Sequence, residues 1–237
     1  MKVIADRFSW PPANRWPLFA TALVLALLAA LAQPFAGEPA DEALKNSTWN
    51  PLNRDSAGHF RVADPANVSA AEAEAVYQEL ARSMAEVYGL SGLAFAAAYQ
   101  SWPRYNTAPY RSVTHGKRYL NNYANAAGRA YGRFEDAGVM PAGTVLAKDS
   151  FSVSKSGEVL VGPLFAMEKM EPGFNPASAD WRYTLVLPDG SILGATKGEN
   201  SDNVAFCVAC HAAAGRGQDH MFFPRRKYRT PLEARAD

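Results

Sequence analysis

The two cysteines of this 237-residue chain stand three positions apart near its end, in the stretch Cys207-Val-Ala-Cys210-His211. This spacing restricts what the thiols can do. A disulfide between residues so close in sequence would be strained. A thioredoxin-type redox pair belongs at the first strand-to-helix turn of a βαβ unit, whereas these cysteines lie near the C-terminus. A zinc site would need further ligands, and only His220 follows nearby.

The same spacing is the one that attaches haem c covalently. On one helical turn, Cys207 and Cys210 can each bond one vinyl group of the porphyrin, and His211 then lies beneath the iron as the proximal ligand. We therefore predict one covalently attached haem c, held by Cys207, Cys210 and His211, with His211 bound to the iron.

The other side of the iron decides the class of cytochrome, because an electron carrier fills it with a methionine or a second histidine. The methionines near enough to consider are Met140, Met167, Met170 and Met221. Met221 follows His211 too closely to reach the opposite face, and the other three lie in expected strands, where a core role is more usual. His115 and His220 are interpreted as polar surface residues. By elimination, we predict a sixth position open to a small ligand or substrate.

The N-terminus has the order of a secretory signal peptide. Lys2, Arg7 and Arg15 precede an uncharged apolar run that ends in Ala30-Leu-Ala32, a spacing of small residues that signal peptidase recognises. A membrane span needs about 20 apolar residues and this run is shorter, which favours cleavage, with an uncleaved anchor as the alternative. We expect residues 1–32 to be a signal peptide and the protein to be periplasmic, in an oxidising compartment.

Charge excludes some partners. The chain has 24 basic and 23 acidic residues, a formal net charge of +1, so it has no strong field to attract nucleic acid. A short basic cluster at Arg225, Arg226, Lys227 and Arg229 is interpreted as a solvated face.

Residues 33–110 are expected to form an irregular arm followed by a helical segment. Ser69 and Glu72 have the spacing of a capping box, which predicts a helix that ends near Gly89. Its apolar stripe is expected to be Val76, Leu80, Met84 and Val87. A second helix is expected over 92–102, before Pro103.

Residues 111–237 are expected to form the haem domain. After His115, a strand should lead into a short helix, and turn signals then separate alternating runs at 144–153, 159–167 and 181–187. Helices followed by antiparallel strands predict an α+β fold. We expect a small antiparallel sheet flanked by helices, with haem c attached near the C-terminus and an additional N-terminal helical segment.

Four pieces in this order resemble the cytochrome P-460 family and its relative cytochrome c′-beta, over about residues 114–229. They are Pro141-Ala-Gly-Thr-Val-Leu-Ala-Lys148, Gly162-Pro-Leu-Phe-Ala-Met-Glu-Lys169, Asp180 to Gly190, and Cys207 to His211 with Asp219 and Phe222. The resemblance implies an antiparallel sheet flanked by helices, a five-coordinate haem c and a homodimer. Some members oxidise hydroxylamine, and the c′-beta relatives bind gases such as nitric oxide.

In the hydroxylamine oxidisers a lysine is linked covalently to the porphyrin, and the resemblance places Lys148 at that position. The residues allow this role, because alternation puts Lys148 on the same strand face as Leu146, and a lysine on an inward face must be paired, neutral or consumed. The alternative is a solvated lysine on an edge strand. Asp219 could bind a nearby backbone amide, orient His211, or cap the turn after Gly217.

The chain departs from the family pattern at the pocket carboxylate, because that position falls nearest Phe165. Glu168 is close, but three residues along a strand point to the opposite face. A phenylalanine would make a dry distal pocket that suits diatomic gases. We therefore expect an exported mono-haem c-type cytochrome that acts on small nitrogen oxides, by hydroxylamine oxidation or nitric oxide binding. The alternative is a non-catalytic gas-binding or electron-transfer cytochrome. The expected partners are a small gaseous or nitrogenous ligand and a redox protein; the sequence leaves open whether the protein is an enzyme.

Overall fold

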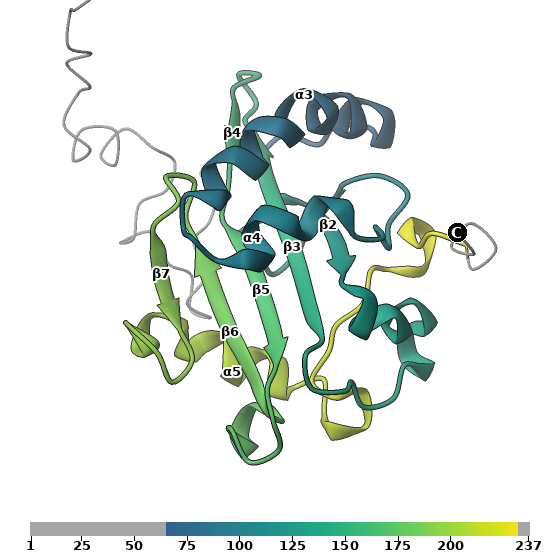
Figure 1. Cartoon of the computed structure of the whole chain (residues 1–237). Coiled ribbons are helices and arrows are strands. Elements are labelled where there is room, and N and C mark those ends of the chain that lie inside the picture. Colours follow the sequence, from purple (N-terminus) through teal and green to yellow (C-terminus); the bar gives the residue numbers. More distant parts are fainter. Residues whose placement is uncertain (1–64, 232–237) are drawn as a thin grey trace, which may run out of the picture. The chain divides into compact units, whose positions relative to one another are not determined.

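The computed structural model describes residues 65–231, which form one antiparallel sheet with helices on its faces (Figure 1). This confirms the α+β class and the antiparallel sheet. The predicted signal peptide and most of the predicted arm lie outside the described residues. Within 65–231, no helix is long and apolar enough to cross a membrane.

The sheet has the strand order β1-β2-β3-β5-β6-β7, and β4 also pairs with β3. The strands are β1 (Tyr110–Arg111), β2 (Tyr119–Ala124), β3 (Val145–Val153), β4 (Val159–Val161), β5 (Leu164–Lys169), β6 (Trp181–Val186) and β7 (Ile192–Ala195). The run predicted at 159–167 is therefore two strands, interrupted at Gly162 and Pro163. Proline removes a donor from the ladder, which explains the interruption.

Helices α3 (Ala70–Gly89) and α4 (Ala94–Ala98) cover one face of the sheet (Figure 1). The predicted capping box is present: Glu72 N donates to Ser69 Oγ at 3.2 Å, and Ser69 N donates to the Glu72 carboxylate at 2.8 Å. The predicted apolar stripe packs against the core on this face, and Met84 is its fully buried member. The other buried residues of α3 are Ala73, Tyr77 and Tyr88, while Val76, Leu80 and Val87 are partly buried at the edge of the same core.

The alternation of β3 divides the molecule into two cores. Ala147 and Phe151 face α3 and α4, whereas Leu146 packs in a second core with Trp181 and Tyr183 on the opposite face. This second face also carries α5 (Ala205–Ala212), the helix that contains both cysteines. It is the face on which the predicted site residues gather.

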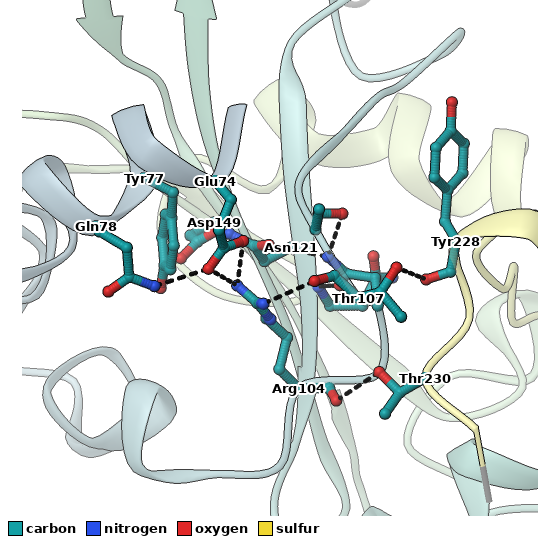
Figure 2. A network of polar contacts seen from close by, with 12 residues as sticks. Glu74, Tyr77, Gln78, Arg104, Thr107, Asn121, Asp149, Tyr228 and Thr230 are labelled. Atoms are coloured by element: carbon teal, nitrogen blue, oxygen red, sulfur yellow. Dashed lines mark hydrogen bonds and ion pairs between the residues drawn. The ribbon is translucent and has the colours of Figure 1, made fainter. Parts of the chain in front are cut away.

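A buried carboxylate lies on the α3 side of β3. Asp149 is fully buried, accepts a hydrogen bond from Asn121 Nδ2 at 3.0 Å and one from the Tyr99 hydroxyl at 3.2 Å. Figure 2 shows it beside Tyr77 of α3, near the ion pair between Arg104 and Glu74. The buried Asp149 carboxyl group is thus held by neutral hydrogen-bond donors on the face of the sheet that α3 covers.

Candidate functional site

The cysteine-containing helix lies across the second face of the sheet, and its two thiols open to different cavities. A short 3-10 turn, Ser201–Val204, leads into α5, and its buried Val204 packs against Leu185 of the sheet. Cys207 lines a first cavity and Cys210 a second. Both are half-buried and form no disulfide with each other. Burial, with the neighbouring Cys210, raises the pKa of the Cys207 thiol to about 12, so this thiol is protonated at neutral pH.

His211 is the buried end of the motif, with only 6% of its surface exposed. Its Nδ1 donates to the main-chain oxygen of His220 at 2.9 Å. This bond fixes the tautomer and orientation of the ring, so Nε2 is the nitrogen that would bind a metal. The rings of Tyr183 and Phe222 pack against it, with centroids at 5.0 Å and 5.3 Å.

The turn that supplies this carbonyl has an unusual backbone. Asp219 and His220 are consecutive non-glycine residues at φ 47° and 56°. Such left-handed residues cost of order 1–3 kcal/mol each where the surrounding structure enforces them, and they cluster at functional sites. The conformation aims the His220 carbonyl at His211.

Asp219 holds that turn in place through buried contacts. Its carboxylate accepts from Lys169 Nζ at 2.5 Å and from the main-chain amide of Met140 at 2.9 Å, and its carbonyl accepts from Trp181 Nε1 at 2.7 Å. Two of the roles considered for Asp219 are observed: its carboxylate binds a backbone amide, and its own amide caps the turn Arg216–Gln218 by donating to Arg216 O at 3.0 Å. Asp219 therefore supports His211 through the next residue in the chain and not by a direct hydrogen bond.

The two cavities adjoin each other beside α5. The first has an empty volume of about 480 Å³ and the second of about 780 Å³, including space open to solvent. Three residues, His115, Lys148 and His211, line both cavities. Apolar side chains make up most of the remaining lining of the first cavity, among them Leu146, Phe165, Leu185 and Phe206. The second cavity is mixed: Val113, Leu120, Phe222 and Phe223 share its lining with Tyr110, Arg111, Ser112, Thr114, Cys210 and Arg225.

Lys148 lies at the centre of the sheet, so it is not the solvated edge-strand lysine of the alternative interpretation. In the register of β3 it is opposite Asn122 of β2 and Phe165 of β5. Burial lowers the pKa of Lys148 to about 8, against an opposing effect of the nearby Cys210. About one tenth of this amine is therefore neutral at pH 7.

Phe165 lies opposite Lys148 in the wall of the first cavity. Its ring meets the His115 ring edge-on, with centroids at 4.9 Å. Glu168 is opposite Val145 and Arg182, three residues along the same strand, so its side chain leaves from the other face, as alternation requires. The five residues predicted from the sequence (Lys148, Phe165, Cys207, Cys210 and His211) thus all line these two cavities.

Sequence reasoning missed His115 and His220. His220 was interpreted as a surface residue, but it is buried, and its carbonyl binds His211. His115 was interpreted as a surface residue, and it instead faces His211, with ring centroids at 6.5 Å. Its local sequence, a polar turn with a glycine, carries no signal for such a position. The predicted core role is seen for Met140 and Met167, which are buried in the second core, whereas Met170 is only partly buried. Met221, for which no core role was predicted, is buried in the same core.

No protein-family model matches this chain, and no curated protein matches its sequence. Within residues 65–231, no three or more His, Cys, Asp or Glu side chains gather into a metal-binding group. The residues do fit the predicted haem c. One thiol at each of two adjoining cavities, and a histidine with its Nδ1 already engaged, are the side chains that would hold it covalently and bind its iron. The Tyr183 hydroxyl in the wall of the first cavity has no partner among the described residues and could bond to a ligand there.

Proposed function

We propose that this protein is an exported mono-haem c-type cytochrome of the P-460 kind that binds small nitrogen oxides. The observation that carries the proposal is the meeting of both cysteines, the anchored His211 and the half-buried Lys148 at two adjoining cavities. In this proposal Cys207 and Cys210 hold the haem as thioethers, and His211 is the proximal ligand. A homodimer in the periplasm, a cleaved signal peptide and a redox protein as partner belong to the same proposal.

The chain also offers partners for the carboxylates of a haem. Arg111 and Arg225 both line the second cavity, and guanidinium groups pair well with carboxylates. The apolar walls would bury the macrocycle. When bound, the haem supplies an iron that takes up nitric oxide or hydroxylamine and exchanges electrons with a partner.

The composition of the pocket favours binding over oxidation. Of the described residues, none that lines either cavity is an aspartate or glutamate, and Phe165 stands where the catalytic members of the P-460 family carry a carboxylate. Oxidation of hydroxylamine must remove protons, and a missing general base typically costs about 10²–10⁴-fold in rate. A neutral diatomic gas needs no base.

One observation keeps hydroxylamine oxidation as a second candidate. Lys148 lines both cavities, and its lowered pKa of about 8 gives it a neutral amine that could accept a proton. A general base is most effective when its pKa is near the working pH. In this second function Lys148 would take the place of the missing carboxylate, unless it is linked to the porphyrin.

Two measurements test the proposed function. Mass spectrometry of the exported protein should show one haem added that survives acid denaturation; a mass equal to the bare polypeptide would refute it. The purified protein should then bind nitric oxide with a clear spectral change. It should reduce an artificial electron acceptor slowly or not at all with hydroxylamine, whereas Phe165→Glu should gain this activity. Rapid turnover by the unaltered protein would favour the second candidate.

A further inference from the structure

The distance between two histidines points to a second metal ligand. The rings of His115 and His211 have centroids 6.5 Å apart and planes at 76°. An imidazole nitrogen binds a metal ion at about 2.0–2.1 Å, and the ring centroid lies about 1.1 Å beyond that nitrogen. Two imidazoles on opposite sides of one metal ion therefore have centroids about 6.3 Å apart. The observed separation agrees with one metal ion between them.

The cavities support the same arrangement. The first cavity and the second cavity have His115, Lys148 and His211 in common. A flat macrocycle with its centre between the two imidazoles would extend into both cavities. Cys207 in the first cavity and Cys210 in the second would then lie along its rim, where vinyl groups are attached.

The loop between β1 and β2 holds His115 in this position. Its main-chain amide donates to Ser112 Oγ at 3.0 Å, and its Nδ1 is 3.3 Å from Ser112 Oγ and 3.2 Å from Thr114 Oγ1. Ser112 is itself buried and its amide donates to Arg118 O at 2.8 Å. With Nδ1 engaged by hydroxyl groups, Nε2 is the nitrogen suited to a metal, the same division of roles as in His211.

We propose that His115 is the sixth ligand of the haem iron in the resting protein and that a small ligand binds by displacing it. This inference rests on the proposed function and changes one part of it: the sixth position opens only when His115 leaves. Ser112 and Arg118 are buried at the two ends of the loop, whereas Val113 and Thr114 beside His115 are exposed and belong to no helix or strand, so His115 can leave by a movement of residues 113–115 alone. Return of His115 would close the site after the ligand dissociates.

The test compares spectra of the full exported protein with those of His115→Ala. Absorption and electron paramagnetic resonance should show a low-spin six-coordinate haem in the unaltered protein and a high-spin haem in the variant. Added imidazole should restore the low-spin spectrum of His115→Ala. If the displaced state is populated at about 1–10%, removing His115 should tighten carbon monoxide binding to the ferrous protein by about 10–100-fold.

Lys117→Gly is the matched control, because it changes the same loop at a residue with φ 60° that lines neither cavity. It should keep the low-spin spectrum. His115→Met should remain six-coordinate with the spectrum of a His/Met haem, which tests the position without depending on the alanine variant. A high-spin unaltered protein, or a low-spin His115→Ala, would overturn the inference while the mass of the attached haem still supports the proposed function. Absence of attached haem would end both.

Discussion

Protonation of Asp149 should make this protein more stable as the pH falls from 7 toward 4. Its carboxyl group is fully buried, and burial raises its pKa from 3.8 to about 6 despite hydrogen bonds from Asn121 and Tyr99 that favour the charged form. The side chains around it, Tyr77 and Tyr123 among them, are themselves buried (Figure 2 shows Tyr77 beside it). At neutral pH, folding therefore removes the Asp149 carboxylate from water, and its hydrogen bonds compensate only part of the desolvation cost.

The magnitude follows from the shift. Each pKa unit corresponds to about 1.4 kcal/mol, so a rise of about two units means that charged Asp149 costs about 3 kcal/mol of folding free energy. The folded state binds this proton more tightly than the unfolded state. The cost is therefore full above pH 6 and vanishes below about pH 4. Between pH 7 and pH 5 the free energy of unfolding should rise by about 1.4 kcal/mol from this group.

The assay is chemical denaturation of the unaltered protein and Asp149→Asn at several pH values from 7 to 4.5. Other groups oppose the trend: the lowered pKa of Glu135, about 2, stabilises the fold only while it is charged, and His220 has a lowered pKa because it is buried. These effects are common to both proteins and cancel in the difference. Asp149→Asn should have the larger free energy of unfolding at pH 7, and the difference from the unaltered protein should shrink as the pH falls. Parallel curves would refute the reasoning.

Two further predictions concern the second face. Asp219→Ala should lower the free energy of unfolding by about 3–5 kcal/mol, because it leaves Lys169 buried without its carboxylate. Glu86→Ala, which removes an exposed ion pair of α3, should lower it by less than about 1 kcal/mol. Equal losses for the two variants in urea denaturation would contradict this. If Lys148 is bonded to the haem, Lys148→Met should shift the ferrous absorption toward that of an ordinary c-type haem, and an unchanged spectrum would show that no such bond exists.

The sequence predicted those parts of the fold that depend on neighbouring residues. The capping box at Ser69, the turn at Gly157 and the alternation around Lys148 are local patterns, and each is found in the structure. Tyr77 and Tyr88 are also buried on α3, but the sequence did not predict them as part of the stripe because tyrosine is polar at one end. Their hydroxyls reach Tyr123 and the carbonyl of Gly162, contacts that no local pattern contains. The strands β1 and β7 were not predicted because each is too short to show a clear alternating pattern.

The candidate site divides in the same way. Cys207, Cys210 and His211 could be predicted because all three lie on one helical turn. The His220 carbonyl could not, since its position depends on two left-handed residues and on the contact of Asp219 with Lys169, fifty residues upstream. His115 faces its partner only because β1 and β2 pair at one side of the sheet and α5 packs across it. Such contacts follow from the fold and not from spacing.

Lys148 and Asp149 show why the site costs the fold stability. They are adjacent charged residues on a central strand, and alternation sends their side chains to opposite faces, so neither can neutralise the other. Asp149 is supported by hydrogen bonds on its own face. The pKa of Lys148, lowered from 10.5 to about 8 by burial, corresponds to a cost of up to about 3 kcal/mol when the amine is charged.

A lysine retained at such a cost is expected where function needs it and packing does not. Lys148→Met should then raise the free energy of unfolding at pH 7 by up to about 3 kcal/mol. The gain should shrink as the pH rises from 8 to 10.5, because the unaltered lysine loses its charge in the folded state first. A less stable methionine variant would mean that the fold itself depends on the amine, and the case for Lys148 as a functional residue would fall.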